Sequence, residues 1–165
     1  MNKANNGSGN NNLRDDWETP KWLFDKLDEQ YIFSFDCCAS KNNAKLEFFS
    51  VDFENTFKFQ MDEYTCWMNP PFSKVKKMFE HFFKVVHKGV AIYRCDNMET
   101  KVWQEVILPL ADWIFIPNKR ISYEKYIGNG SRFPSALIGK GLPPPKNIRG
   151  KTLYFINNKL NEDGK

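Results

Sequence analysis

The chain has 165 residues, 41% of them hydrophobic and 16% aromatic, with 24 basic and 20 acidic side chains. A chain of this length and composition can bury roughly two-thirds of its unfolded surface, which indicates one globular domain. No run approaches the ~18 apolar residues of a membrane helix, and residues 1–12 lack the apolar core of a secretory signal. We therefore expect a cytoplasmic protein that does not contact a membrane.

The four cysteines are scattered along the chain, at Cys37, Cys38, Cys66 and Cys95. Without a secretory signal, we expect reduced thiols rather than disulfides. No Cys-x-x-Cys pair and no nearby histidine completes a zinc ligand set, so no metal site is expected.

The two ends of the chain differ in composition from its body. Residues 1–14 are rich in Asn, Gly and Ser, and such a segment cannot bury enough apolar surface to fold. We expect a disordered tail there, a second short tail at 158–165, and a single domain over 15–157.

The first predicted element is a helix with Thr19 as its N-cap and Pro20 as its first helical residue. Apolar residues then recur at helical spacing as far as Tyr31. The aromatic run at 31–35 predicts a short buried strand that ends at Asp36.

A second strand is expected at 64–68, ending at Asn69. Ser73 is the expected cap of the clearest helix in the chain, and Gly89 is its stop signal. The apolar residues of this helix recur at helical spacing: Val75, Met78, Phe79, Phe82, Phe83 and Val86.

The rest of the body is expected to be a helix at 100–110 and strands at 90–94, 112–117, 135–139 and 151–156. Strands that alternate with helices predict an α/β fold with a mostly parallel sheet. The last strands have no helix between them, which favours an antiparallel edge.

Positive charge gathers in the segment 119–151. This segment holds eight basic residues against Glu124 alone, a net charge of +7, whereas residues 1–118 hold 14 basic and 17 acidic residues, a net charge of −3. Such asymmetry is expected of a protein that holds a polyanion at one face. A solvated loop enriched in lysine by chance would give the same count.

Polar residues stand where predicted strands end, at Asp36 and at Asn69, with Asp52 between them. Ligands of α/β sheets bind at the carboxyl ends of strands, although an aspartate there is often a turn former. Asn69 is followed by two prolines, which fix the backbone and hold the Asn69 amide and the Pro70 carbonyl stiffly. The combination favours a binding site over three unrelated turns.

The stretch "NPPF" at 69–72 resembles the signature of amino-directed, S-adenosylmethionine-dependent methyltransferases. With "DDWETPKWLFDKLD", "FDCCAS" and the late "RISY" and "GSRFPSALIG", the chain resembles the phage DNA N6-adenine methyltransferase family over roughly 15–156. The resemblance implies a Rossmann-like class I methyltransferase fold, S-adenosylmethionine as cofactor and DNA as substrate, in a bacterial or phage-infected cell. No obligate protein partner is evident.

The resemblance also implies roles for the box Asn69, Pro70, Pro71 and Phe72. An exocyclic adenine amine is a poor nucleophile because its lone pair is delocalised. The Asn69 oxygen and the Pro70 carbonyl would accept hydrogen bonds from its two N–H groups and aim the nitrogen lone pair at the methyl group. Phe72 would stack on the adenine after it has rotated out of the duplex.

By the same resemblance, the cofactor would contact Trp17, Thr19, Pro20, Asp36, Ala39, Asp52 and Phe53. The loop at 37–40 departs from the Gly-rich form of larger methyltransferases. The segment 119–151 would recognise the target, with Lys119, Arg120, Lys125 and Arg132 on the nucleic acid.

Three alternatives stay open. They are an RNA adenine methyltransferase, a protein-glutamine methyltransferase and a catalytically silent nucleic-acid-binding relative. The +7 segment argues against protein as substrate but not against RNA, and the intact Asn69-Pro70-Pro71-Phe72 box argues against loss of activity.

Overall fold

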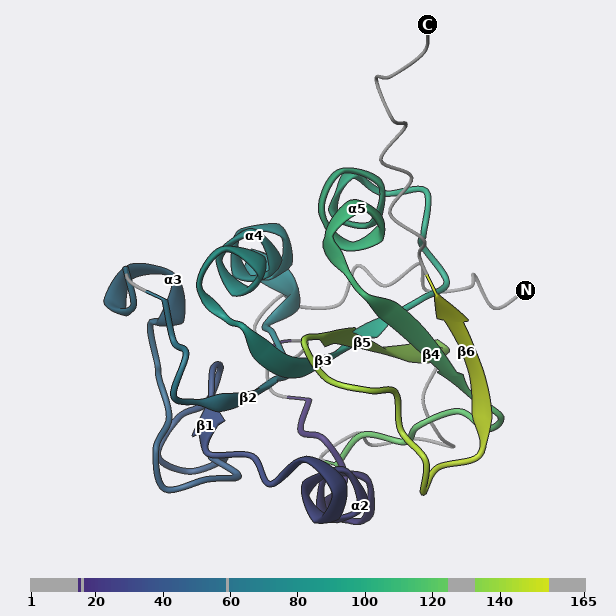
Figure 1. Ribbon diagram of the computed structural model, residues 1–165, viewed down its shortest axis with the longest axis horizontal. Helices are drawn as coiled ribbons and strands as arrows, with labels where there is room; N and C mark the ends of the chain where they lie inside the picture. Colours follow the sequence, from purple (N-terminus) through teal and green to yellow (C-terminus); the bar gives the residue numbers. More distant parts are fainter. Residues whose placement is uncertain (1–14, 16, 59, 125–132, 155–165) are drawn as a thin grey trace, which may run out of the picture.

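The computed structural model describes residue 15 and residues 17–58, 60–124 and 133–154. A six-stranded sheet lies between two layers of helices (Figure 1). The strands are β1 (Phe35–Asp36), β2 (Thr65–Met68), β3 (Lys88–Arg94), β4 (Trp113–Pro117), β5 (Ser135–Lys140) and β6 (Gly150–Tyr154). The helical elements are α2 (Lys21–Tyr31), α3 (Phe53–Thr56), the 3₁₀ turn η1 (Phe72–Lys74), α4 (Val75–Val85), the π-helical η2 (Val102–Ile107) and α5 (Leu108–Leu110).

The strand order is β1-β2-β3-β5-β4-β6. The β1–β2 and β2–β3 pairs are parallel, and the other three pairs are antiparallel. The predicted α/β class and the parallel first strands are confirmed, but the antiparallel part is half of the sheet rather than an edge. The reason is that β5 inserts between β3 and β4 and runs antiparallel to both.

The register brings several strand ends to one edge of the sheet. β4 runs in the direction of β3, because each of them is antiparallel to β5. Arg94 at the end of β3 pairs with Ser135, and Pro117 at the end of β4 pairs with Gly150. The ends of β1 to β4 and the starts of β5 and β6 therefore share one edge, which we call the carboxyl edge.

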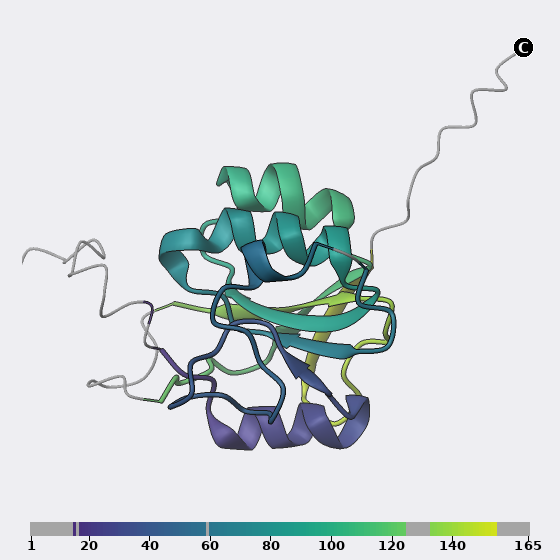
Figure 2. The same cartoon turned by 90° about the vertical axis from the view of Figure 1, so that its left-hand side faces the viewer.

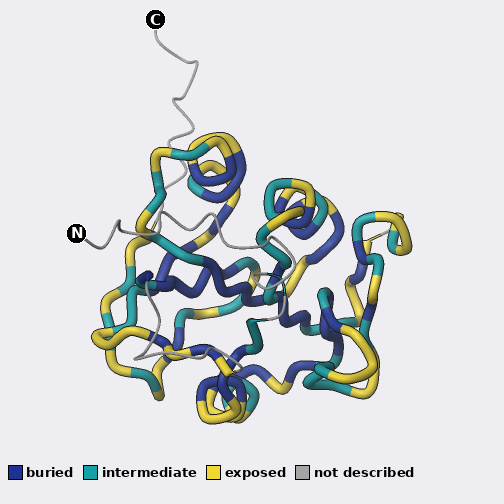
Figure 3. Tube along the Cα trace, turned by 180° about the vertical axis from the view of Figure 1, so that it is seen from behind, coloured by how far each residue is buried: buried dark blue, intermediate teal, exposed yellow. Residues whose placement is uncertain are grey.

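Two hydrophobic clusters hold the layers together. Helix α2 packs its apolar side on one face of the sheet, against residues that include Trp67, Ile92 and Trp113. Helices α3, α4 and η2 cover the other face (Figure 2), around Met68, Tyr93 and Ile114. Strands β2, β3 and β5 are mostly buried, whereas the edge strand β6 is largely exposed (Figure 3).

Some predicted boundaries are wrong at the start of the domain. Helix α2 begins at Lys21, with Pro20 as N-cap and no side-chain capping bond. Thr19 does not cap it, because the N-cap position falls one residue later and the Thr19 hydroxyl forms no hydrogen bond with the helix. The helix extends to Tyr31, whose ring belongs to its apolar stripe, and Ile32 ends it with φ 53°. The strand expected at 31–35 is consequently reduced to Phe35 and Asp36.

The predicted boundaries of the later helices and strands agree better with the structure. Ser73 does not cap α4, which begins at Val75 after the turn η1. The helix expected at 100–110 is present but mainly π-helical, and Pro109 near its end lacks the N–H that an α-helical register would use. The four later strands lie within two residues of their predicted starts.

The expected tails, 1–14 and 158–165, lie outside the described residues. No helix in the described part of the chain combines the length and apolar character needed to cross a bilayer. All four cysteines are free thiols.

Candidate active site

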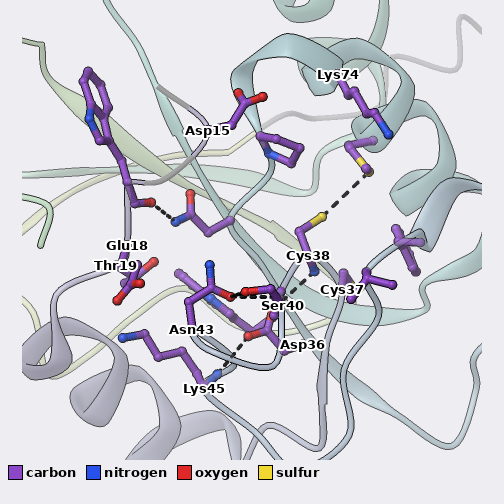
Figure 4. Close-up of a pocket in the computed structure, with 18 of the residues that line it drawn as sticks. Asp15, Glu18, Thr19, Asp36, Cys37, Cys38, Ser40, Asn43, Lys45 and Lys74 are labelled. Carbon is purple, nitrogen blue, oxygen red and sulfur yellow. Dashed lines mark hydrogen bonds between the residues drawn. The ribbon is translucent and has the colours of Figure 1, made fainter. Parts of the chain in front are cut away.

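A cavity of about 280 Å³ opens at the carboxyl edge (Figure 4). Its walls come from the chain before α2, the loop after β1, the end of β2 and the start of α4. The lining includes charged and polar side chains that reach it from these segments, among them Asp15, Glu18, Thr19, Asp36, Asn69, Lys45 and Lys74. The site is thus assembled from segments far apart in the sequence.

The first wall is the N-terminal arm, by which we mean Asp15 and residues 17–20. Thr19 is 1% exposed, and its hydroxyl oxygen has no hydrogen-bond partner among the described residues. A buried hydroxyl without a partner is costly, so this atom is suited to a polar group of a ligand. Trp17 also lines the cavity, whereas Pro20 is buried behind it.

The loop after β1 supplies a buried carboxylate. Asp36 is 2% exposed, and its two oxygens accept the N–H of Cys38 at 3.3 Å and of Lys45 at 3.1 Å. Burial raises the pKa of Asp36 to about 6, although these N–H groups and the Lys45 charge oppose the shift. Figure 4 shows Glu18 and Thr19 across from this loop.

The remaining predicted cofactor residues divide into two groups. Ala39 and Phe53 are buried and line the cavity. Asp52 does not line it, and its carboxylate accepts a hydrogen bond from the side-chain amide of Asn55 at 2.8 Å. Its predicted contact with the cofactor adenine stays a prediction.

Asn69 lies at the end of β2 with a fixed side chain. Its Nδ2 donates to the carbonyl of Trp17 at 2.9 Å, so Oδ1 is the atom left to accept a hydrogen bond from a ligand. Among the described residues, no hydrogen bond uses the carbonyl of Pro70. Pro71 lines the cavity, and its carbonyl accepts the N–H of Lys74 at 3.1 Å. Asn69 therefore offers a side-chain acceptor at the cavity, whereas Pro70 is buried and does not line the cavity.

Phe72 belongs to an aromatic cluster beside the cavity rather than to its lining. Its ring meets Trp17 and Tyr93 edge-on, with centroids 5.5 and 5.6 Å away. Trp17 in turn stacks on Phe133 at 5.1 Å. Aromatic rings in such arrangements stabilise one another beyond their buried area, so the ring of Phe72 has a defined orientation.

Arg94 at the end of β3 joins this cluster. Its guanidinium lies 4.8 Å from the ring centre of Phe133 and forms two hydrogen bonds of 2.7 Å with Asp96. The pair lowers the pKa of Asp96 below its ordinary value. Arg94 and Phe133 were not predicted as site residues, because nothing in their local sequence signals that the fold brings them close to Trp17.

Four charged residues that line the cavity were not predicted as site residues: Asp15, Glu18, Lys45 and Lys74. Asp15 and Glu18 stand in the stretch 15–28 that supports the family resemblance, but the sequence assigned them no role. Asp15 accepts the N–H and the hydroxyl of Ser73, 58 residues away. Only the folded chain reveals that these groups share one cavity.

The described basic residues of the segment 119–151 lie at more than one place on the molecule. Lys119 and Arg120 are exposed and follow the end of β4 at the carboxyl edge. Lys140 lies at the opposite edge, where its ammonium donates to the carbonyl of Phe83, and Lys146 lies beside α2. Lys125 and Arg132 lie outside the described residues.

Within the described part of the chain, no cluster of three His, Cys, Asp or Glu side chains could hold a metal ion.

Comparison with known proteins identifies the family of the chain. The family model for DNA N-6-adenine-methyltransferase (Dam) matches residues 7–137, a range that includes the arm, the cavity and the Asn69 box. A DNA N-6-adenine-methyltransferase of Haemophilus phage HP1 (strain HP1c1) is 30% identical over 129 residues, covering 74% of this chain and 72% of that protein. The chain belongs to the DNA N-6-adenine-methyltransferase family.

Proposed function

We propose that the protein transfers the methyl group of S-adenosylmethionine to N6 of an adenine that has rotated out of duplex DNA. The observation that carries this proposal is the orientation of Asn69. Its amide nitrogen is held by the Trp17 carbonyl, which leaves its oxygen as an acceptor at the cavity.

The cavity suits S-adenosylmethionine in size and in charge. Its volume of about 280 Å³ is near the lower end of small-molecule sites, roughly 300–1,000 Å³. The lining holds three carboxylates, Asp15, Glu18 and Asp36, against two ammonium groups, Lys45 and Lys74. This excess of negative charge suits a ligand with a net positive charge, and the Thr19 hydroxyl supplies a buried hydrogen-bonding group.

When bound, S-adenosylmethionine would supply an electrophilic methyl group on a sulfonium; the S–CH3 bond breaks as the N–CH3 bond forms, S-adenosylhomocysteine is the leaving group, and one amine proton is released to solvent. The work of the protein is to prepare the amine. Asn69 Oδ1 and the Pro70 carbonyl accept hydrogen bonds from the two N–H groups of the adenine amine. These hydrogen bonds draw the nitrogen lone pair out of conjugation with the ring. Both acceptors are fixed before the substrate arrives, so positive charge that develops on the nitrogen meets oriented dipoles at little reorganisation cost.

Base rotation is needed because the amine cannot be approached in line within the duplex. Phe72 is the proposed stacking partner, and such stacking contributes about 1–3 kcal/mol per base. The edge-on contacts of Phe72 with Trp17 and Tyr93 support this role because they set its ring plane.

DNA is proposed to lie along the carboxyl edge, with Lys119 and Arg120 on the phosphate backbone. Their exposure and their position after β4 support this, since the same edge carries the cavity. Lys125 and Arg132 are proposed as further contacts from the sequence alone. Lys140 and Lys146 are excluded from the proposal because they lie elsewhere.

The test is incubation with S-adenosylmethionine labelled in its methyl group and, separately, with DNA, RNA and bulk protein, followed by nucleoside and amino-acid analysis. We expect label in 6-methyladenine from DNA. Label in RNA adenine alone would favour the RNA enzyme. No transfer by protein that binds DNA would favour a catalytically silent relative.

A further inference from the structure

We propose that the N-terminal arm is a brace for the catalytic amide of Asn69, with Asp15 and Glu124 as its positioning residues. This inference rests on the proposed function, because it assigns Asn69 to the methyl-transfer step. Figure 2 shows the arm (purple) and the segment before residue 125 (green) at the same edge of the sheet.

The arm is tied to the catalytic box at one end. Asp15 accepts the backbone N–H of Ser73 at 3.0 Å through Oδ1 and the Ser73 hydroxyl through Oδ2. Ser73 lies in the turn directly after the Asn69-Pro-Pro-Phe box. Asp15 therefore fixes the distance between the start of the arm and the box.

The middle of the arm carries the contact that matters for chemistry. The Trp17 carbonyl accepts the Asn69 amide at 2.9 Å. The indole of Trp17 is held in turn by two neighbouring rings, with centroids 5.1 Å from Phe133 and 6.1 Å from Tyr123. A shift of the arm would move this carbonyl and release the Asn69 side chain to rotate.

The far end of the arm is tied to the basic segment. Glu124 donates its backbone N–H to the carbonyl of Glu18 at 2.9 Å, and its carboxylate accepts the N–H of Lys21 at 2.7 Å. The same carboxylate lies 3.9 Å from the ammonium of Lys45. The Glu124 carboxylate thus caps α2, whose own N-cap residue forms no side-chain capping bond. Glu124 holds the end of the arm that lies farther along the chain from Asp15.

A displacement of about 1 Å in a group that positions a substrate can lower a rate about 100-fold. Neither Asp15 nor Glu124 is proposed to touch the adenine, so their loss should act on the chemical step through Asn69. The measurement is the single-turnover rate constant for 6-methyladenine formation, with S-adenosylmethionine and duplex DNA both saturating. This rate constant, unlike the amplitude, does not depend on the fraction of protein that is folded.

We expect Asp15→Ala and Glu124→Ala to lower the rate constant at least about tenfold. Asp15→Asn and Glu124→Gln should recover most of it, because an amide oxygen still accepts the Ser73 or Lys21 N–H. Glu29→Ala and Glu63→Ala are matched controls, since both acids are exposed near the opposite edge of the sheet. They should leave the rate constant unchanged.

Two outcomes would overturn the inference while the wild type remains active. One is an unchanged rate constant in both alanine variants, with loss of amplitude alone. The other is an equal fall in the control variants. Absence of 6-methyladenine with the wild type would instead contradict the proposed function.

Discussion

Replacement of Asp36 by Asn tests how a buried carboxylate serves the proposed cofactor site. Asp36 is 2% exposed, and its pKa is raised from 3.8 to about 6 by burial. An unfolded aspartate loses its proton near pH 3.9, so the folded protein binds more protons between about pH 4 and 6. The contribution of this group to stability therefore falls as the pH rises through that window.

The size of the effect follows from the shift. About two pH units at 1.36 kcal/mol each amount to about 3 kcal/mol, lost between pH 4 and pH 7. Asp36→Asn also weakens the bonds from Cys38 and Lys45, but this cost does not change with pH. The difference in unfolding free energy between wild type and variant isolates Asp36, because the other carboxyl groups cancel.

The assay is urea unfolding of both proteins without cofactor at pH 4, 5, 6 and 7. We expect the wild type to lose about 3 kcal/mol relative to Asp36→Asn across this range. In calorimetry with S-adenosylhomocysteine, wild-type affinity should fall about tenfold between pH 7 and pH 5, while the weaker binding of the variant should stay flat. A stability difference that is constant with pH, or equal cofactor affinity in both proteins, would refute the reasoning.

Three further predictions concern single contacts. Thr19→Val should weaken S-adenosylhomocysteine binding about five- to tenfold, as measured by calorimetry. The stability of the cofactor-free protein should be kept or raised, because the substitution removes a buried hydroxyl without a partner. A loss of more than about 1 kcal/mol in thermal unfolding would contradict this prediction. Phe72→Ala should lower methylation by about 10- to 100-fold through lost stacking, and a 2-aminopurine placed at the target adenine should then report less base rotation by its fluorescence; unaltered fluorescence and rate would remove Phe72 from the site. Lys119→Ala should reduce the slope of log affinity against log salt by about 0.9 on duplex DNA, while the matched control Lys146→Ala should not change it. Equal slopes in both variants would show that DNA binds at another surface of the protein.

Local patterns in the sequence predicted the parts of the fold that local patterns decide. The apolar stripe of α4 and the buried strands β2 and β3 appear as expected, because the spacing of apolar residues within each segment predicts which side chains are buried. The position of Asn69 at the end of β2 follows from the two prolines, which stop the strand. The cavity beside Asn69 was accordingly predicted at the correct edge of the sheet.

Long-range pairing decided what the sequence could not show. The helix expected to be capped by Thr19 is capped by Glu124, 103 residues from its partner Lys21. Glu124 counted in the sequence only as the single acid of a basic segment. The +7 charge of that segment likewise suggested one face, but the turn from β5 to β6 separates Lys146 from Lys119. Sequence spacing carries no information on such contacts until the strand order is known.

The most direct test of the central claim is the single-turnover formation of 6-methyladenine in DNA by Asn69→Ala, with S-adenosylmethionine and DNA saturating. The substitution removes one of the two proposed acceptors for the adenine amine but leaves the Thr19 and Asp36 side of the cavity intact. We predict a rate constant at least about 1,000-fold below wild type, with S-adenosylhomocysteine affinity within about twofold. Formation of 6-methyladenine at the wild-type rate would contradict the account.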